Sequence, residues 1–119
     1  MMAEILPLWT ADPERPGVRA LIEAWRGEIK TDLAAAKAWE GGLWQTIDVR
    51  PLLGRIACPT LLLVGDLDPL CGPSQGRLIA QAIPHAEVVT VPGSGHLIPA
   101  EAPEAFKAAV IQFCEQTGS

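Results

Sequence analysis

The hydrophobic pattern changes character near the middle of the chain. In residues 1–54 apolar positions recur at helical spacing and no strand signal occurs. A first helix is predicted over residues 13–29, with Asp12 as its N-cap and Pro16 in its first turn. Thr31 is the expected cap of a second helix over residues 32–39, which Gly41 and Gly42 end. Short helical turns are expected at residues 43–47 and 49–53.

The second half has the pattern of an α/β unit. Residues 60–64 are a continuous apolar run, as expected for a strand buried on both faces of a parallel sheet. Ser74 is the predicted N-cap of a helix that ends at Ile83, and a second strand follows at residues 87–91. A closing helix over residues 104–115 has one apolar face. Strand, helix, strand and helix in this order predict parallel strands with a right-handed crossover.

These patterns divide the chain at about residue 54. Residues 1–54 form a helical segment that holds all four tryptophans, and residues 55–119 form the α/β segment. Two strands leave both outer edges of a sheet with unpaired backbone groups, so self-association or a covering partner is expected. Trp25 is expected in the core, on the apolar face of the first helix.

Composition narrows the class of protein and its location. The chain has 119 residues, of which 49% are hydrophobic and 19% charged, which favours one packed globule. A net charge of −5 without basic clusters argues against nucleic acid or an anionic membrane as a partner. The start has neither a basic leader nor a long apolar run, and three cysteines are an odd number without metal-type spacing. Reduced thiols and a cytoplasmic location are therefore expected, with Cys58 and Cys114 as small core residues.

Candidate chemistry lies at the ends of the two predicted strands. Residues 91–97, Val-Pro-Gly-Ser-Gly-His-Leu, present His96 in a glycine-rich turn, and residues 65–68, Gly-Asp-Leu-Asp, follow the first strand. A carboxylate fixes the tautomer of a histidine that works as an acid and base. Asp68 is the preferred carboxylate. Asp66 is expected to bind its own turn backbone, and the other histidine, His85, to lie on the surface.

These segments resemble the later part of the α/β-hydrolase family. Residues 56–68 are similar to the strand and turn of the catalytic acid, 83–89 to the next strand, 91–96 to the histidine loop and 102–106 to the closing helix. The resemblance implies a partial α/β-hydrolase fold, with residues 1–54 as a cap-like segment. It also implies Asp68 as acid, His96 as general base, and hydrolysis of a small apolar ester or lactone without metal or organic cofactor.

A nucleophile is harder to identify. The family's serine lies in a Gly-x-Ser-x-Gly elbow directly after a strand. Residues 72–76 match that motif formally, but several residues separate Ser74 from the predicted strand; Ser94 is a weaker candidate still, and Cys71 is an ordinary loop thiol. The expected source of the nucleophile is therefore a missing N-terminal half or a partner chain. Two alternatives stay open: a non-catalytic binding or assembly module, and a self-sufficient esterase that uses Ser74 or Cys71.

Overall fold

A computed structural model describes residues 6–28, 42 and 46–118 of the chain. The second helix expected over residues 32–39 lies outside these described residues, as do its cap at Thr31 and two of the tryptophans, Trp39 and Trp44. Within the described residues no helix is both long and apolar enough to cross a membrane.

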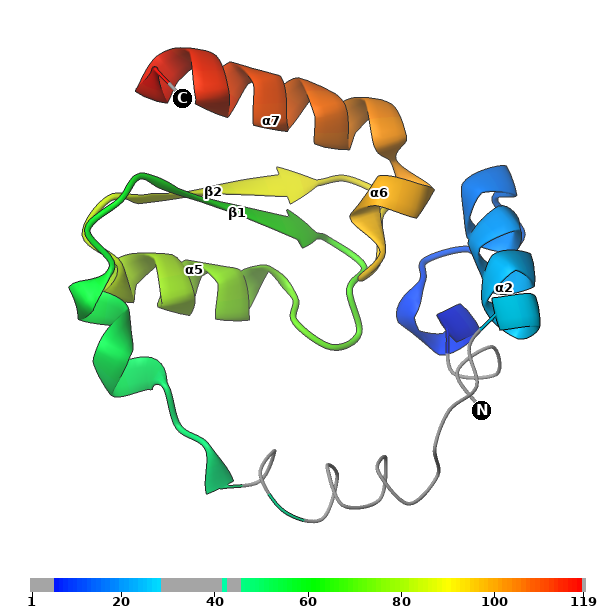
Figure 1. The fold of residues 1–119 in the computed structure, drawn as a ribbon, viewed down its shortest axis with the longest axis horizontal. Coiled ribbons are helices and arrows are strands. Elements are labelled where there is room, and N and C mark those ends of the chain that lie inside the picture. The colour runs from blue at the N-terminus through cyan, green and yellow to red at the C-terminus, as the bar shows by residue number, and fades with distance from the viewer. Residues whose placement is uncertain (1–5, 29–41, 43–45, 119) are drawn as a thin grey trace.

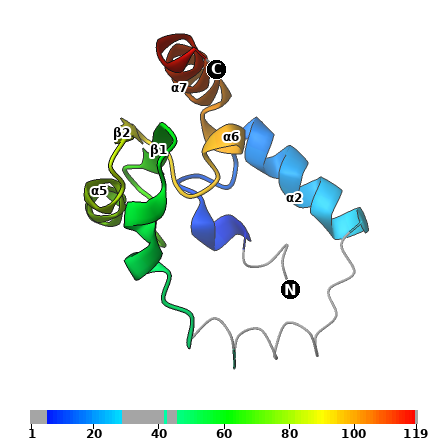
Figure 2. The ribbon, with the colours of Figure 1, turned by 60° about the vertical axis from the view of Figure 1, so that its left-hand side comes forward.

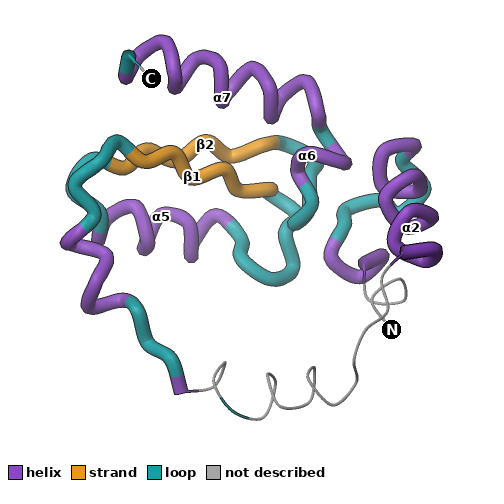
Figure 3. Tube along the Cα trace, viewed as in Figure 1, coloured by secondary structure: helices purple, strands orange, loops and turns teal. Residues whose placement is uncertain are grey.

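The α/β unit consists of two parallel strands between two helices (Figures 1 and 3). Strand β1 (Thr60–Gly65) pairs with β2 (Ala86–Val91), in register from Thr60 opposite Ala86 to Gly65 opposite Val91. The crossover helix α5 (Pro73–Ala82) covers one face, and α7 (Pro103–Thr117) covers the other. The predicted order of elements is confirmed, with bounds that differ by one or two residues.

The first strand is less buried than its sequence predicts. Val64 is buried, but the residues from Thr60 to Leu63 are only half-buried. The sheet of the described residues has two strands, so no neighbour covers the outer edge of β1. At the buried end, α5 approaches closely through Gly76, where a Cβ would lie 2.6 Å from Val64 Cγ2.

A second cluster of elements lies at the carboxyl ends of the strands. Helix α2 (Pro16–Glu28) packs against the short helix α6 (Ile98–Glu101), and Val18 and Ile22 are its buried residues. The partly buried residues around them are Trp9, Trp25, Leu97 and Ala100. The 3₁₀ turn η1 (Leu6–Trp9) precedes α2, and Figures 1 and 2 both place this segment between α2 and the strands. Trp25 therefore packs against the small core that the helical pattern predicts.

The two predicted helix caps that lie within the described residues, Asp12 and Ser74, are both wrong. Helix α2 begins at Pro16, and the Asp12 carboxylate instead accepts the Glu14 N–H in a local turn. The N-cap of α5 is Gly72, followed by Pro73 at the first helical position, where a missing N–H costs nothing. The Ser74 hydroxyl donates to Gln75 Oε1.

Three further predictions have mixed outcomes. The turns expected at residues 49–53 are present as a 3₁₀ helix, η2 (Arg50–Arg55). The assignment of Cys58 to the core is wrong: Cys58 is exposed, because it lies in the loop before β1 and not in the strand. Cys114 is half-buried. The apolar face predicted on the closing helix is confirmed. Its four positions, Phe106, Ala109, Val110 and Phe113, are half-buried, and most of the residues between them are exposed.

Candidate active site

The two strands deliver one carboxylate and one imidazole to the same edge of the sheet. Asp68 follows β1 and His96 follows β2, and the carboxyl ends of parallel strands lie side by side. His96 Nδ1 lies 2.9 Å from Asp68 Oδ2. The Asp68 side chain is 6% exposed and the His96 side chain 40%, so the acid is enclosed while the imidazole remains accessible. The predicted pair is therefore brought together.

Hydrogen bonds from His96 and from two backbone N–H groups hold the Asp68 carboxylate in its charged form. Burial by itself would raise the pKa of Asp68, but hydrogen bonds from His96 and from the Leu70 and Cys71 N–H groups outweigh it and lower that pKa. The two backbone bonds, 2.8 and 3.1 Å long, both reach Oδ1 and leave Oδ2 to His96. An ionised carboxylate can only accept, so the imidazole proton lies on Nδ1 and Nε2 carries a free lone pair. Such an Nε2 can take up a proton from a hydroxyl.

The segment before α2 also contacts His96. The His96 N–H donates to the Trp9 carbonyl over 2.7 Å, and the imidazole meets the Trp9 indole edge-on, with ring centroids 6.0 Å apart. Residues far apart in sequence thus fix both the backbone and the ring of the candidate base. No sequence pattern singled out Trp9 for this contact.

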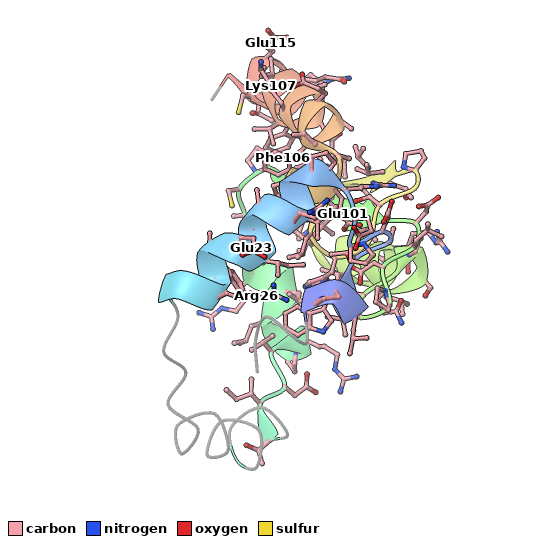
Figure 4. All side chains as sticks on the ribbon, turned by 90° about the vertical axis from the view of Figure 1, so that its right-hand side faces the viewer. Glu23, Arg26, Glu101, Phe106, Lys107 and Glu115 are labelled. Atoms are coloured by element: carbon pink, nitrogen blue, oxygen red, sulfur yellow. The ribbon has the colours of Figure 1, made fainter. Side chains whose placement is uncertain are left out.

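A buried glutamate that sequence reasoning missed organises the same loop. Glu101, labelled in Figure 4, ends α6 and is 7% exposed. Its carboxylate accepts from the N–H groups of Ala11, Gly95 and Leu97, over 2.6, 3.0 and 3.1 Å. The one available signal was a carboxylate directly after the apolar segment 97–100, where a charged residue has to find polar partners.

Asp66 is a structural carboxylate, but it does not bind its own turn as expected. Its Oδ1 accepts the Gly93 N–H over 2.6 Å. This bond joins the loop of residues 66–72 after β1, here called the acid loop, to the histidine loop of residues 91–96. Gly93 has φ of +68°, a left-handed conformation that favours glycine, so the sequence of this turn suits the bend before His96. The Leu67 N–H adds a bond of 3.0 Å to the Ser94 carbonyl.

The three candidate nucleophiles have other surroundings. The Ser74 hydroxyl is exposed and binds Gln75, while Cys71 is half-buried in the acid loop. Ser94 is fully buried, and its hydroxyl has no hydrogen-bond partner in the described part of the chain. Among the described residues, Asp68 is the one side chain hydrogen-bonded to the imidazole. His85, at the other end of β2, is exposed as expected.

An open apolar cavity of about 510 Å³ lies between α2 and the segment around α6. Its walls include Leu21 and Ala24 of α2 and, opposite them, His96, Leu97 and Pro99. The candidate base thus borders a space that could receive an apolar group. Within residues 6–28, 42 and 46–118, no three histidine, cysteine, aspartate or glutamate side chains form a group that could hold a metal ion.

Fold and site together define a parallel α/β unit with an Asp–His pair at the carboxyl edge of its sheet. A family model for the alpha/beta hydrolase fold matches residues 23–103, more than half of the chain, and the chain belongs to this family. The predicted fold class is confirmed.

Two of the curated relatives are named as an esterase and as a lactonase. The chain is 35% identical over 81 residues to a pimeloyl-[acyl-carrier protein] methyl ester esterase of Yersinia enterocolitica, a match that covers 66% of this chain and 31% of that protein. It is 36% identical over 63 residues to 3-oxoadipate enol-lactonase 2 of Acinetobacter baylyi, covering 53% and 23%.

Solved structures are similar over nearly the whole chain. An esterase from Thermogutta terrifontis has a TM-score of 0.77 at 28% identity, covering 99% of this chain and 44% of that one. The enol-lactonase from Burkholderia xenovorans LB400 also has a TM-score of 0.77, at 26% identity, covering 96% and 44%. The chain therefore spans less than half the length of these relatives.

Proposed function

We propose that Asp68 and His96 are the acid and the base of a Ser-His-Asp triad that hydrolyses a carboxylic ester or lactone. The observation that carries this proposal is the 2.9 Å contact between His96 Nδ1 and the enclosed Asp68 carboxylate. The relatives named as a methyl ester esterase and as enol-lactonases support the ester or lactone class. The apolar cavity beside His96 supports a small apolar substrate.

In this mechanism His96 takes up and releases one proton in each of two half-reactions: the serine proton passes to the alcohol, and then a water proton passes back to the serine oxygen. His96 Nε2 removes the proton from a serine hydroxyl while the serine oxygen bonds to the substrate carbonyl carbon. The tetrahedral intermediate then breaks its bond to the alcohol oxygen, which takes the proton from the imidazolium. Water repeats the sequence on the acyl-serine and releases the acid. Asp68 holds the imidazole by Nδ1 and stabilises its positive form.

The serine and the oxyanion donors come, in this proposal, from a further segment or a partner chain with the rest of a hydrolase sheet. The surroundings of Ser74 and Ser94 support this, since one hydroxyl binds Gln75 and the other is sealed from solvent. The half-buried residues of β1 and its unpaired outer edge support an added strand. A minimal esterase that uses Ser74 or Cys71 would need one of these groups to reach His96.

Association is part of the same proposal. A second copy of the chain and the remaining hydrolase half are both candidates to cover the open sheet edge. Light scattering of the purified chain should give a mass above that of one copy, and a stable monomer would rule out self-association. The boundary at residue 54 and the cytoplasmic location stay predictions.

A chimera tests the chemistry. The chain replaces the matched part of the Burkholderia enol-lactonase, and hydrolysis of a nitrophenyl ester is measured. His96→Ala should lower the rate by about 10²- to 10⁴-fold, the usual contribution of a general base. His85→Ala, the matched control on an exposed histidine, should leave it unchanged.

The outcomes separate the candidate functions. Full activity of the His96→Ala chimera would refute the role of His96. Hydrolysis by the isolated chain that His96→Ala abolishes would instead refute the need for an external nucleophile. A non-catalytic binding module would give no His96-dependent turnover, and His96→Ala would leave the binding of apolar ligands intact.

A further inference from the structure

We propose that Glu101 is a positioning residue that sets the tautomer and orientation of His96. The proposal rests on the proposed role of His96 as a base. Glu101 Oε2 accepts from the N–H groups of Gly95 and Leu97, the two residues that flank His96, over 3.0 and 3.1 Å. One carboxylate oxygen therefore fixes the backbone on both sides of the imidazole.

The three consecutive N–H groups of this loop are all engaged. Those of Gly95 and Leu97 point to Glu101, and that of His96 points to the Trp9 carbonyl. The imidazole reaches Asp68 only if the backbone at residue 96 holds this orientation. A small rotation of the loop would lengthen the 2.9 Å bond between Nδ1 and Asp68 and release the preference for a proton on Nδ1.

The other carboxylate oxygen couples the loop to the segment before α2. Glu101 Oε1 accepts the Ala11 N–H over 2.6 Å. In the same region the Arg15 guanidinium donates to the backbone carbonyls of Glu101 and Gly93, over 3.1 and 2.7 Å. The placement of the base therefore depends on how residues 9–15 lie against the loop, with Glu101 as the shared acceptor.

Burial makes the glutamate hard to replace. A carboxylate that is 7% exposed is costly unless its oxygens are hydrogen-bonded, and here three N–H donors meet it. An apolar side chain at this position would leave the same three donors without a partner. A purely structural glutamate would affect the stability of the chain but not the tautomer of His96 in the folded state.

The test measures the tautomer of the His96 imidazole directly. The ¹⁵N shifts of the His96 ring are measured at pH 8 in the labelled 119-residue chain, and exposed His85 is the internal reference. Wild type should show one tautomer, with the proton on Nδ1. Glu101→Gln keeps the size of the side chain but turns an amide donor toward N–H groups, and it should give a mixture of both tautomers. Glu104→Gln, on the exposed first turn of α7, is the control and should match wild type.

Each outcome decides the proposal. A folded Glu101→Gln chain with the wild-type tautomer would overturn it. If Glu101→Gln does not fold, Glu101→Asp decides, because it keeps the charge but withdraws both oxygens by one methylene. Mixed tautomers in that variant support the proposal and a single tautomer overturns it. The measurement needs no turnover, so an inactive chimera would refute the proposed function without affecting this result.

Discussion

Replacing Gly17 by alanine should destabilise the chain, although the same exchange in a helix usually stabilises it. Gly17 lies in the first turn of α2, where alanine would ordinarily add about 0.5–1 kcal/mol. Here a Cβ would fall on the carbonyl oxygen of Ala100, far inside van der Waals contact. Overpacking of this kind costs about 1–3 kcal/mol, so the net loss after the helix gain is roughly 0–2.5 kcal/mol. The upper half of that range is expected, because the contacted atom belongs to the backbone and cannot swing aside as a flexible side chain does.

Urea unfolding followed by tryptophan fluorescence measures this effect, because Trp9 and Trp25 both pack on the Val18–Ile22 cluster. Gly54→Ala is the matched control: its Cβ would meet only the Ala82 carbonyl oxygen, at an ordinary 3.8 Å. Gly54→Ala should therefore change the free energy of unfolding by less than about 0.5 kcal/mol. A Gly17→Ala chain that is more stable than wild type would show that α2 does not lie against α6 as described.

Two further predictions concern stability. Val18 is fully buried, so Val18→Ala should lower the free energy of unfolding by about 2 kcal/mol. Leu78 is 67% exposed, so the control Leu78→Ala should change that free energy by less than about 0.5 kcal/mol. Equal losses for the two variants in urea titrations would contradict the described core. The pKa of Asp68 is lower in the folded state than in the unfolded state. The stability that ionised Asp68 contributes is therefore complete above its unfolded pKa of about 3.9 and is lost as pH falls through the folded pKa. Acid titrations should therefore show the stability gap between wild type and Asp68→Asn closing below about pH 4, and a gap that widens there would refute the assignment.

The sequence predicted the parts of the site that follow from local order. Asp68 and His96 each lie in the loop that follows an apolar run, and parallel pairing brings such loops together at one edge of the sheet. Glu101 was missed because its partners are backbone N–H groups, which every residue carries, and Ala11 is distant in sequence. Ser74 was misread as a helix cap because Gly72 and Pro73 can begin the helix without a side-chain bond. The burial of β1 was overestimated because an apolar run does not show whether a neighbouring strand is present.

The most direct measurement is the rate of ester hydrolysis by the chimera with each of the two candidate acids changed. Asp68→Asn should lower the rate by about 10³- to 10⁴-fold, because the amide no longer favours the productive tautomer of His96. Asp66→Asn should change it only a few-fold, because the amide oxygen can still accept the Gly93 N–H. A rate unaffected by Asp68→Asn, or lowered as much by Asp66→Asn, would contradict the assignment of Asp68 and His96 as the acid–base pair.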